Sequence, residues 1–177
     1  MERDAVDLIV EQWAHVRPDL DASPVNVLGR LSRVTRIVER EFQALFSEFG
    51  LQMGEFDVLG TLVRAGAPGG MTAGELTRHS MKTAGAITNR LDRLVAKGYV
   101  TRDLDPANRR SVIVALTPAG RELIDRVIGA HFDNSRRILA ALDPHQQGDL
   151  ATTLRTLLIS LGDQAKDTSE ATPAGDA

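Results

Sequence analysis

Hydrophobic residues recur at three- and four-residue spacing through most of this chain, and that period predicts helices. The first is expected over 2–17. The second begins at Ser23-Pro24, with Ser23 as N-cap and Pro24 at the first helical position, and ends near Gly50. A third is expected over about 54–65. The N-terminal part of the chain is therefore predicted to be entirely helical.

A short helix over 72–79, a turn at 80–82 and a longer helix over about 83–97 are predicted next. Thr72 and Glu75 match a capping box for the short helix. The longer helix is expected to pack inward through an apolar face, made of Ile87, Leu91, Leu94 and Val95. This order is that of a helix-turn-helix.

Two antiparallel strands, Tyr99–Leu104 and Ser111–Thr117, are expected after these helices, joined by the loop DPANRR. A strand pair closed by a basic loop and placed directly behind a helix-turn-helix is the pattern of a winged helix-turn-helix. The predicted fold class is therefore mainly α, with a small β-hairpin wing.

The C-terminal part returns to helical spacing. Thr117-Pro118 predicts a helix to about 142, and Asp143-Pro144 with Gln146 a last helix to about 161. The flanking helices carry apolar stripes too extensive for one winged module to cover, which indicates dimerisation. The expected division is an extra helix and linker (1–22), a dimerisation helix (23–53), the winged helix-turn-helix (54–117), C-terminal dimerisation helices (118–163) and a disordered tail (164–177).

Composition narrows the class of protein. At 177 residues, with 42% hydrophobic and 25% charged residues, the chain is typical of a globular domain with extra helices. It has no cysteine, which excludes disulfides, thiolate zinc sites and thiol redox sensing. The acidic N-terminus holds no long apolar run, so we expect neither a membrane partner nor a secretion signal. The expected location is cytoplasmic.

No catalytic pattern is present in the sequence. The four histidines are scattered, with no HExxH, and neither GxSxG nor a phosphate-binding loop occurs. We therefore predict no enzyme activity, no cofactor and no metal site.

Positive charge collects between residues 72 and 117. This segment holds eight Lys/Arg against four Asp/Glu, a net charge of +4 in a chain of −3, so the remainder carries −7. An acidic protein with one basic module is expected to bind a polyanion through that module, and the predicted fold makes that polyanion double-stranded DNA.

The N-terminal part of a recognition helix reads bases in the major groove. The residues expected there are small or polar, namely Lys82, Thr83, Ala84, Gly85, Thr88 and Asn89. Arg93 and Lys97 lie further along and are predicted to contact phosphates, as is Lys82 at the helix entry. In the hairpin loop, Arg109 is expected to enter the minor groove, with Arg110 in support.

The runs GAITNRLDRL, KGYV and DPANRRSVIVALTPAG resemble the MarR family of winged-helix transcription regulators. The similarity extends over about residues 24–162. It implies a homodimer joined by its first and last helices, bound to a pseudo-palindromic operator and acting as a repressor. One departure is Asn108, where the family usually has Asp; it can hydrogen-bond a wing arginine but cannot pair with it ionically.

The N-terminal extension is similar to that of the family's urate-responsive subgroup. That resemblance implies four ligand residues at matching positions, namely Trp13, Asp57, Arg90 and Arg102. A planar anion needs an aromatic or apolar face and a guanidinium, which Trp13 with Arg90 or Arg102 supplies. A small aromatic or anionic effector, such as urate, is therefore expected to release the DNA.

Two other regulator types remain open at this point. Histidines and carboxylates of the terminal helices could meet in a metal sensor, which zinc would release from DNA. A ligand-independent DNA-binding protein would instead show a steep salt dependence and little preference for an operator. Thr88 and Asn89 argue against the latter, because binders of the DNA backbone rely more on Lys and Arg.

Overall fold

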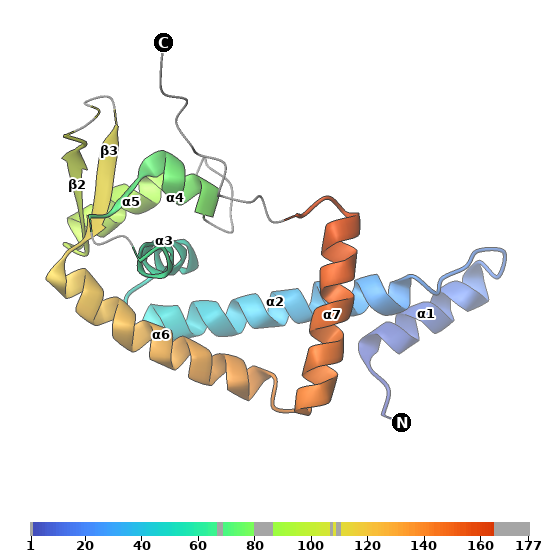
Figure 1. The fold of residues 1–177 in the computed structure, drawn as a ribbon. Coiled ribbons are helices and arrows are strands. Elements are labelled where there is room, and N and C mark those ends of the chain that lie inside the picture. The colour runs from blue at the N-terminus through green and yellow to red at the C-terminus, as the bar shows by residue number, and fades with distance from the viewer. Residues whose placement is uncertain (1, 67–68, 80–86, 107, 109–110, 165–177) are drawn as a thin grey trace, which may run out of the picture. The chain divides into compact units, whose positions relative to one another are not determined.

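A computed structural model of the chain describes residues 2–66, 69–79, 87–106, 108 and 111–164. It is mainly helical, with one small antiparallel sheet (Figure 1). The described elements, in chain order, are α1 (Ala5–Val16), α2 (Val25–Glu48), α3 (Met53–Arg64), β1 (Met71–Thr72), α4 (Ala73–His79), α5 (Ile87–Ala96), β2 (Val100–Leu104), β3 (Val112–Leu116), α6 (Pro118–Ile138) and α7 (Pro144–Ser160). The chain forms two compact units, residues 1–135 and 136–177.

The core of the first unit lies where the C-terminal end of α2 meets α3, α4, α5, the sheet and the start of α6. In Figure 1, α4 and α5 lie beside the β2–β3 hairpin. The largest fully buried side chains of this core include Phe46, Leu59, Leu91 and Ile124. Burying a Leu or Phe contributes about 1.5–3 kcal/mol, so this core holds α5 to the rest of the unit.

The sheet has three strands in the order β1-β3-β2, one more than the sequence predicted. β1 has only two residues, and Met71 pairs with Val114 of β3. Gly70 precedes it with φ of 91°, and a Cβ there would lie 2.3 Å from the Val114 carbonyl oxygen. Two residues carry no readable period, so only pairing with β3 defines this strand.

Several predicted helix signals are confirmed. The Thr72 N–H and hydroxyl both donate to Glu75 at 2.8 Å, which closes the capping box before α4. Thr117 caps α6 by accepting from the Gly120 N–H at 3.0 Å, and Asp143 caps α7. Gly50 ends α2 with φ of 68°.

Other details of the prediction are wrong. Ser23 does not cap α2, because its N–H and hydroxyl are both held by Asp21 at 2.9 Å, and the helix begins at Val25. The first helix begins at Ala5 rather than near residue 2, since Asp4 accepts from the backbone of the first turn. Val95 is 40% exposed and does not belong to the inward face of α5. The long helix after Pro118 ends at Ile138, not near residue 142.

Candidate nucleic-acid interface and adjoining cavity

The recognition helix α5 is anchored on one face and open on the other. Ile87, Leu91 and Leu94 are buried, while Thr88 and Asn89 are exposed between them. The two predicted reading residues that the structure describes therefore lie on the accessible face of the helix. The other four predicted there, Lys82, Thr83, Ala84 and Gly85, lie outside the described residues, as does the predicted turn at 80–82.

The wing is a regular β2–β3 hairpin, with Val100 opposite Leu116 and Leu104 opposite Val112. At its loop, the Asn108 amide donates to the Ser111 hydroxyl at 3.1 Å. Asn108 thus helps to close the loop locally, in place of the family's ionic partner. The two predicted groove residues, Arg109 and Arg110, lie outside the described part of the chain.

A buried carboxylate holds the far end of α5, and sequence reasoning missed it. Glu55 of α3 is fully buried. Its Oε2 accepts from Lys97 Nζ and from the Gln52 N–H, each at 2.8 Å, and its Oε1 lies 3.3 Å from Arg93 Nε. Burial disfavours the charged carboxyl, but these three donors outweigh it, so the pKa of Glu55 lies below its ordinary value. Two of the three predicted phosphate contacts, Arg93 and Lys97, are therefore already hydrogen-bonded to α3.

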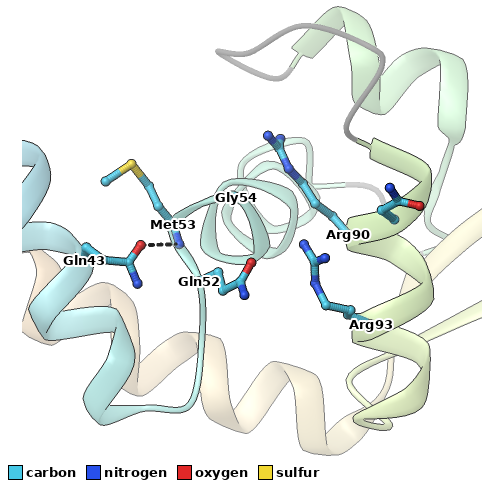
Figure 2. Close-up of a pocket in the computed structure, with 7 residues that line it drawn as sticks. Gln43, Gln52, Met53, Gly54, Arg90 and Arg93 are labelled. Carbon is cyan, nitrogen blue, oxygen red and sulfur yellow. Dashed lines mark hydrogen bonds between the residues drawn. The ribbon is translucent and has the colours of Figure 1, made fainter.

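Beside this carboxylate, residues of α2, α3 and α5 line an open cavity of about 560 Å³ (Figure 2). It is lined by Gln43, Gln52, Met53, Gly54, Asn89, Arg90 and Arg93. Arg90 lies against Gly54, whose missing side chain leaves room for it: a Cβ there would be 2.4 Å from Arg90 Nε. Among the described atoms, the buried Nη1 of Arg90 finds no hydrogen-bond partner. A lone buried guanidinium nitrogen beside a cavity is chemically suited to an anion.

The predicted ligand quartet does not share one cavity within a single chain. Arg90 lines the cavity just described, whereas Asp57 lines another of about 370 Å³ between α3 and α6. Trp13 is 49% exposed and lines a shallow hollow with its own α1 neighbours. Arg102 of β2 pairs with Asp92 of α5, its Nη1 2.5 Å from Oδ1. The common site of these four residues stays a prediction.

His131 of α6 borders the cavity that Asp57 lines, and it was not among the predicted site residues. Its ring lies 4.7 Å from that of Phe42 and 4.9 Å from that of Phe56, measured between centroids. Desolvation in this aromatic cluster lowers the pKa of His131. Phe56, Val63, Ile128 and Phe132 make much of the cavity lining apolar, with Asp57 and Arg64 as charged residues beside them.

In the described part of the chain, no three or more His, Asp or Glu side chains gather where they could hold a metal ion. None of the helices in those residues is both long and apolar enough to cross a bilayer.

The recognition helix α5, which has one buried face, follows the short helix α4 and precedes the β2–β3 hairpin. These elements define a winged helix-turn-helix DNA-binding protein. A sequence profile of the MarR family matches residues 49–111. The chain is 40% identical over 150 residues to the HTH-type transcriptional regulator PecS of Dickeya dadantii (strain 3937), with 85% of this chain and 88% of PecS covered. The chain belongs to the MarR family, and it is a transcriptional regulator that binds DNA, not an enzyme.

Two other comparisons agree. An HTH-type transcriptional repressor of Mycobacterium tuberculosis (strain ATCC 25618 / H37Rv) is 31% identical over 137 residues, which is 77% of this chain and 95% of the relative. A solved structure of a mutant MarR from E. coli complexed with operator DNA has a TM-score of 0.67 and 26% identity, covering 82% and 97% of the two chains. Both comparisons extend well beyond the residues that the family profile matches.

Proposed function

We propose that this regulator is a homodimeric repressor, which a small anionic or aromatic ligand such as urate releases from a pseudo-palindromic operator. The observation that carries the ligand half of this proposal is Arg90. Its Nη1 is buried without a hydrogen-bond partner among the described residues, and the Arg90 residue lines a cavity large enough for a small planar ligand. An anion there would form charge-assisted hydrogen bonds with the guanidinium.

The position of Arg90 links that ligand to DNA binding. Arg90 lies on α5 directly after the exposed Thr88 and Asn89. A ligand that binds one position of α5 more tightly than the other shifts the equilibrium toward the released state. A change from mostly bound to mostly released requires a difference of a few kcal/mol in ligand affinity between the two states.

Exposed apolar side chains support the dimer. On α2, Val27 is 58% exposed and Val34 57%. On α7, Leu158 is 49% exposed and Ile159 48%. Such surfaces favour burial against a second copy of the chain. Twofold symmetry would then place the two recognition helices in half-sites roughly 34 Å apart.

The DNA contacts follow the same reasoning. Thr88 and Asn89 are exposed on α5 and suit base edges, Asn pairing with adenine and the Thr methyl with thymine. The proposal retains the remaining predicted contacts, with Lys82 to Gly85 at the helix entry, Arg93 on α5, and Arg109 and Arg110 on the wing. The operator-bound E. coli MarR, similar at 26% identity, supports this docking mode.

The test begins with a duplex selected from a random library by the full-length chain. Fluorescence anisotropy of this duplex would follow its release during titration with urate and a panel of aromatic acids, and sedimentation would give the oligomeric state. We expect a dimer, release by at least one anion, and loss of that release in Arg90→Ala with DNA binding retained. A monomer would refute the dimer, and release that Arg90→Ala leaves unchanged would refute the ligand site.

A further inference from the structure

We propose that Glu55 is a positioning residue for DNA recognition, which fixes α5 on α3 through Lys97 and Arg93, and that Lys97 acts in this latch and not as a phosphate contact. These three side chains, Glu55, Arg93 and Lys97, form the Glu55 latch. The inference concerns DNA binding alone and does not depend on the ligand.

The geometry of Lys97 is the first reason. Its Nζ donates to Glu55 Oε2 at 2.8 Å and to the Gly50 carbonyl oxygen, also at 2.8 Å. An ammonium has three N–H groups, so two are already used. Moving the ammonium away to follow a DNA phosphate would break both hydrogen bonds and leave the buried carboxylate with only Arg93 and the Gln52 N–H as donors.

Helix ends provide the second reason. Glu55 lies in the first turn of α3, where its carboxylate also caps the Gln52 N–H. Gly50 follows the C-terminal end of α2. The negative charge thus lies at a helix N-terminus and the ammonium at a helix C-terminus, as the two macrodipoles favour. Lys97, the residue directly after α5, therefore joins the end of α5 to the C-terminal end of α2 and the first turn of α3.

Burial makes the network costly to break. The Glu55 side chain is 0% exposed, whereas those of Arg93 and Lys97 are 45% and 34% exposed. A buried carboxylate that loses its partner is strongly unfavourable, unlike an exposed ion pair. The latch holds the C-terminal end of α5, so it sets the angle at which the exposed N-terminal residues meet the groove.

Salt dependence separates positioning from phosphate binding. A cation that neutralises a DNA phosphate contributes about 0.9 to the slope of log K against log salt. A residue that only orients the helix contributes nothing to that slope but changes the preference for one sequence over another. The probes are the library-selected duplex and a shuffled duplex of the same composition, measured by anisotropy over a series of KCl concentrations.

Four variants complete the design. They are Lys97→Met, Glu55→Gln, the double variant, and Glu48→Gln. The last is the control for Glu55→Gln, because it removes the same negative charge at an exposed position on α2. We expect Lys97→Met to keep the wild-type slope while its preference for the selected duplex falls about tenfold, a size usual for coupled side chains. The double variant should be no worse than Glu55→Gln, and Glu48→Gln should match the wild type.

The contrary result is clear. A slope for Lys97→Met lower by about 0.9 per chain, with sequence preference unchanged, would make Lys97 a phosphate contact and overturn the proposal. Circular dichroism checks the folding of each variant. Should Glu55→Gln fail to fold, the slope and preference of Lys97→Met decide the question alone, because Lys97 is a partly exposed side chain outside the core.

Discussion

The guanidinium of Arg90 occupies the space that a side chain at position 54 would fill, with Arg90 Nε 2.4 Å from the ideal Cβ position of Gly54. The absence of a Cβ on α3 is therefore what allows a side chain of the recognition helix to lie in the cavity wall. This contact couples the first turn of α3 to α5, and adding one methyl group at position 54 tests it.

Gly54→Ala should displace Arg90 without removing its charge. The atoms in conflict belong to the flexible end of the arginine, so the fold is expected to survive. If Arg90 binds the effector, the ligand concentration that half-releases the DNA should rise about tenfold, since one charge-assisted hydrogen bond is worth roughly 1.5–3 kcal/mol. Anisotropy titrations would measure this, and a release curve identical to that of the wild type would contradict it.

Arg30→Ala should loosen α1 from α2. Arg30 Nε lies 2.8 Å from Asp4 Oδ2, and its Nη2 lies 2.7 Å from Asp7 Oδ1. These bonds fasten the N-terminal end of α1, so their loss should speed proteolysis of the N-terminus and shift the emission of Trp13. Arg17→Ala is the control, because its partner Asp19 is only two residues away. Equal cleavage rates in both variants would contradict the role of Arg30.

His131 should make stability depend on pH. Burial lowers the pKa of His131 in the folded chain, so on acidification the unfolded chain takes up the proton first. Its contribution to stability is full above the unfolded value of about 6.5 and declines as pH falls below it. Urea unfolding at pH 7.5 and 5.5 should show a smaller loss in His131→Phe than in the wild type. His145→Phe, at a side chain 85% exposed, should retain the wild-type loss.

Gly120→Ala should destabilise the junction between wing and α6. An added Cβ would lie 1.9 Å from the Tyr99 carbonyl oxygen, a backbone atom that also accepts from the Thr117 N–H at 3.1 Å. Overpacking of this kind costs roughly 1–3 kcal/mol. Gly129→Ala, in the same helix with open space around it, should lose no stability. Urea unfolding midpoints would compare the two, and similar midpoints would show that the backbone adjusts freely.

Much of the fold could be predicted from the sequence because the signals for its helix ends are local. The capping box of Thr72 and Glu75, the Thr117 cap and the stop at Gly50 each depend on residues within a few positions of one another. The predicted Ser23 cap was wrong because of another local interaction. Asp21, two residues earlier, accepts a hydrogen bond from the Ser23 N–H. The apolar face of α5 was correct at three positions out of four; Val95 alone is exposed.

The sites were predicted less completely, because their partners are distant in the chain. The contact of Glu55 with Lys97 joins residues 42 apart, and nothing in the surrounding sequence shows that this capping glutamate also has a distant partner. The positions of Arg93 and Lys97 predicted phosphate contacts, and this stays a prediction. The sequence did not show that both side chains also contact Glu55, because that acceptor lies far away in the chain. Asp57 and Arg90, matched by family resemblance, prove to line different cavities within one chain.

By itself, the sequence determined the order of helices and strands, the basic winged module and the family, because helical period, caps and motif spacing act over short range. Only the tertiary structure decided that β1 joins the sheet, that Gly54 makes room for Arg90, and that a buried carboxylate holds the end of the recognition helix. These features arise from contacts between segments far apart in the chain, where desolvation and close packing select partners that local pattern cannot specify.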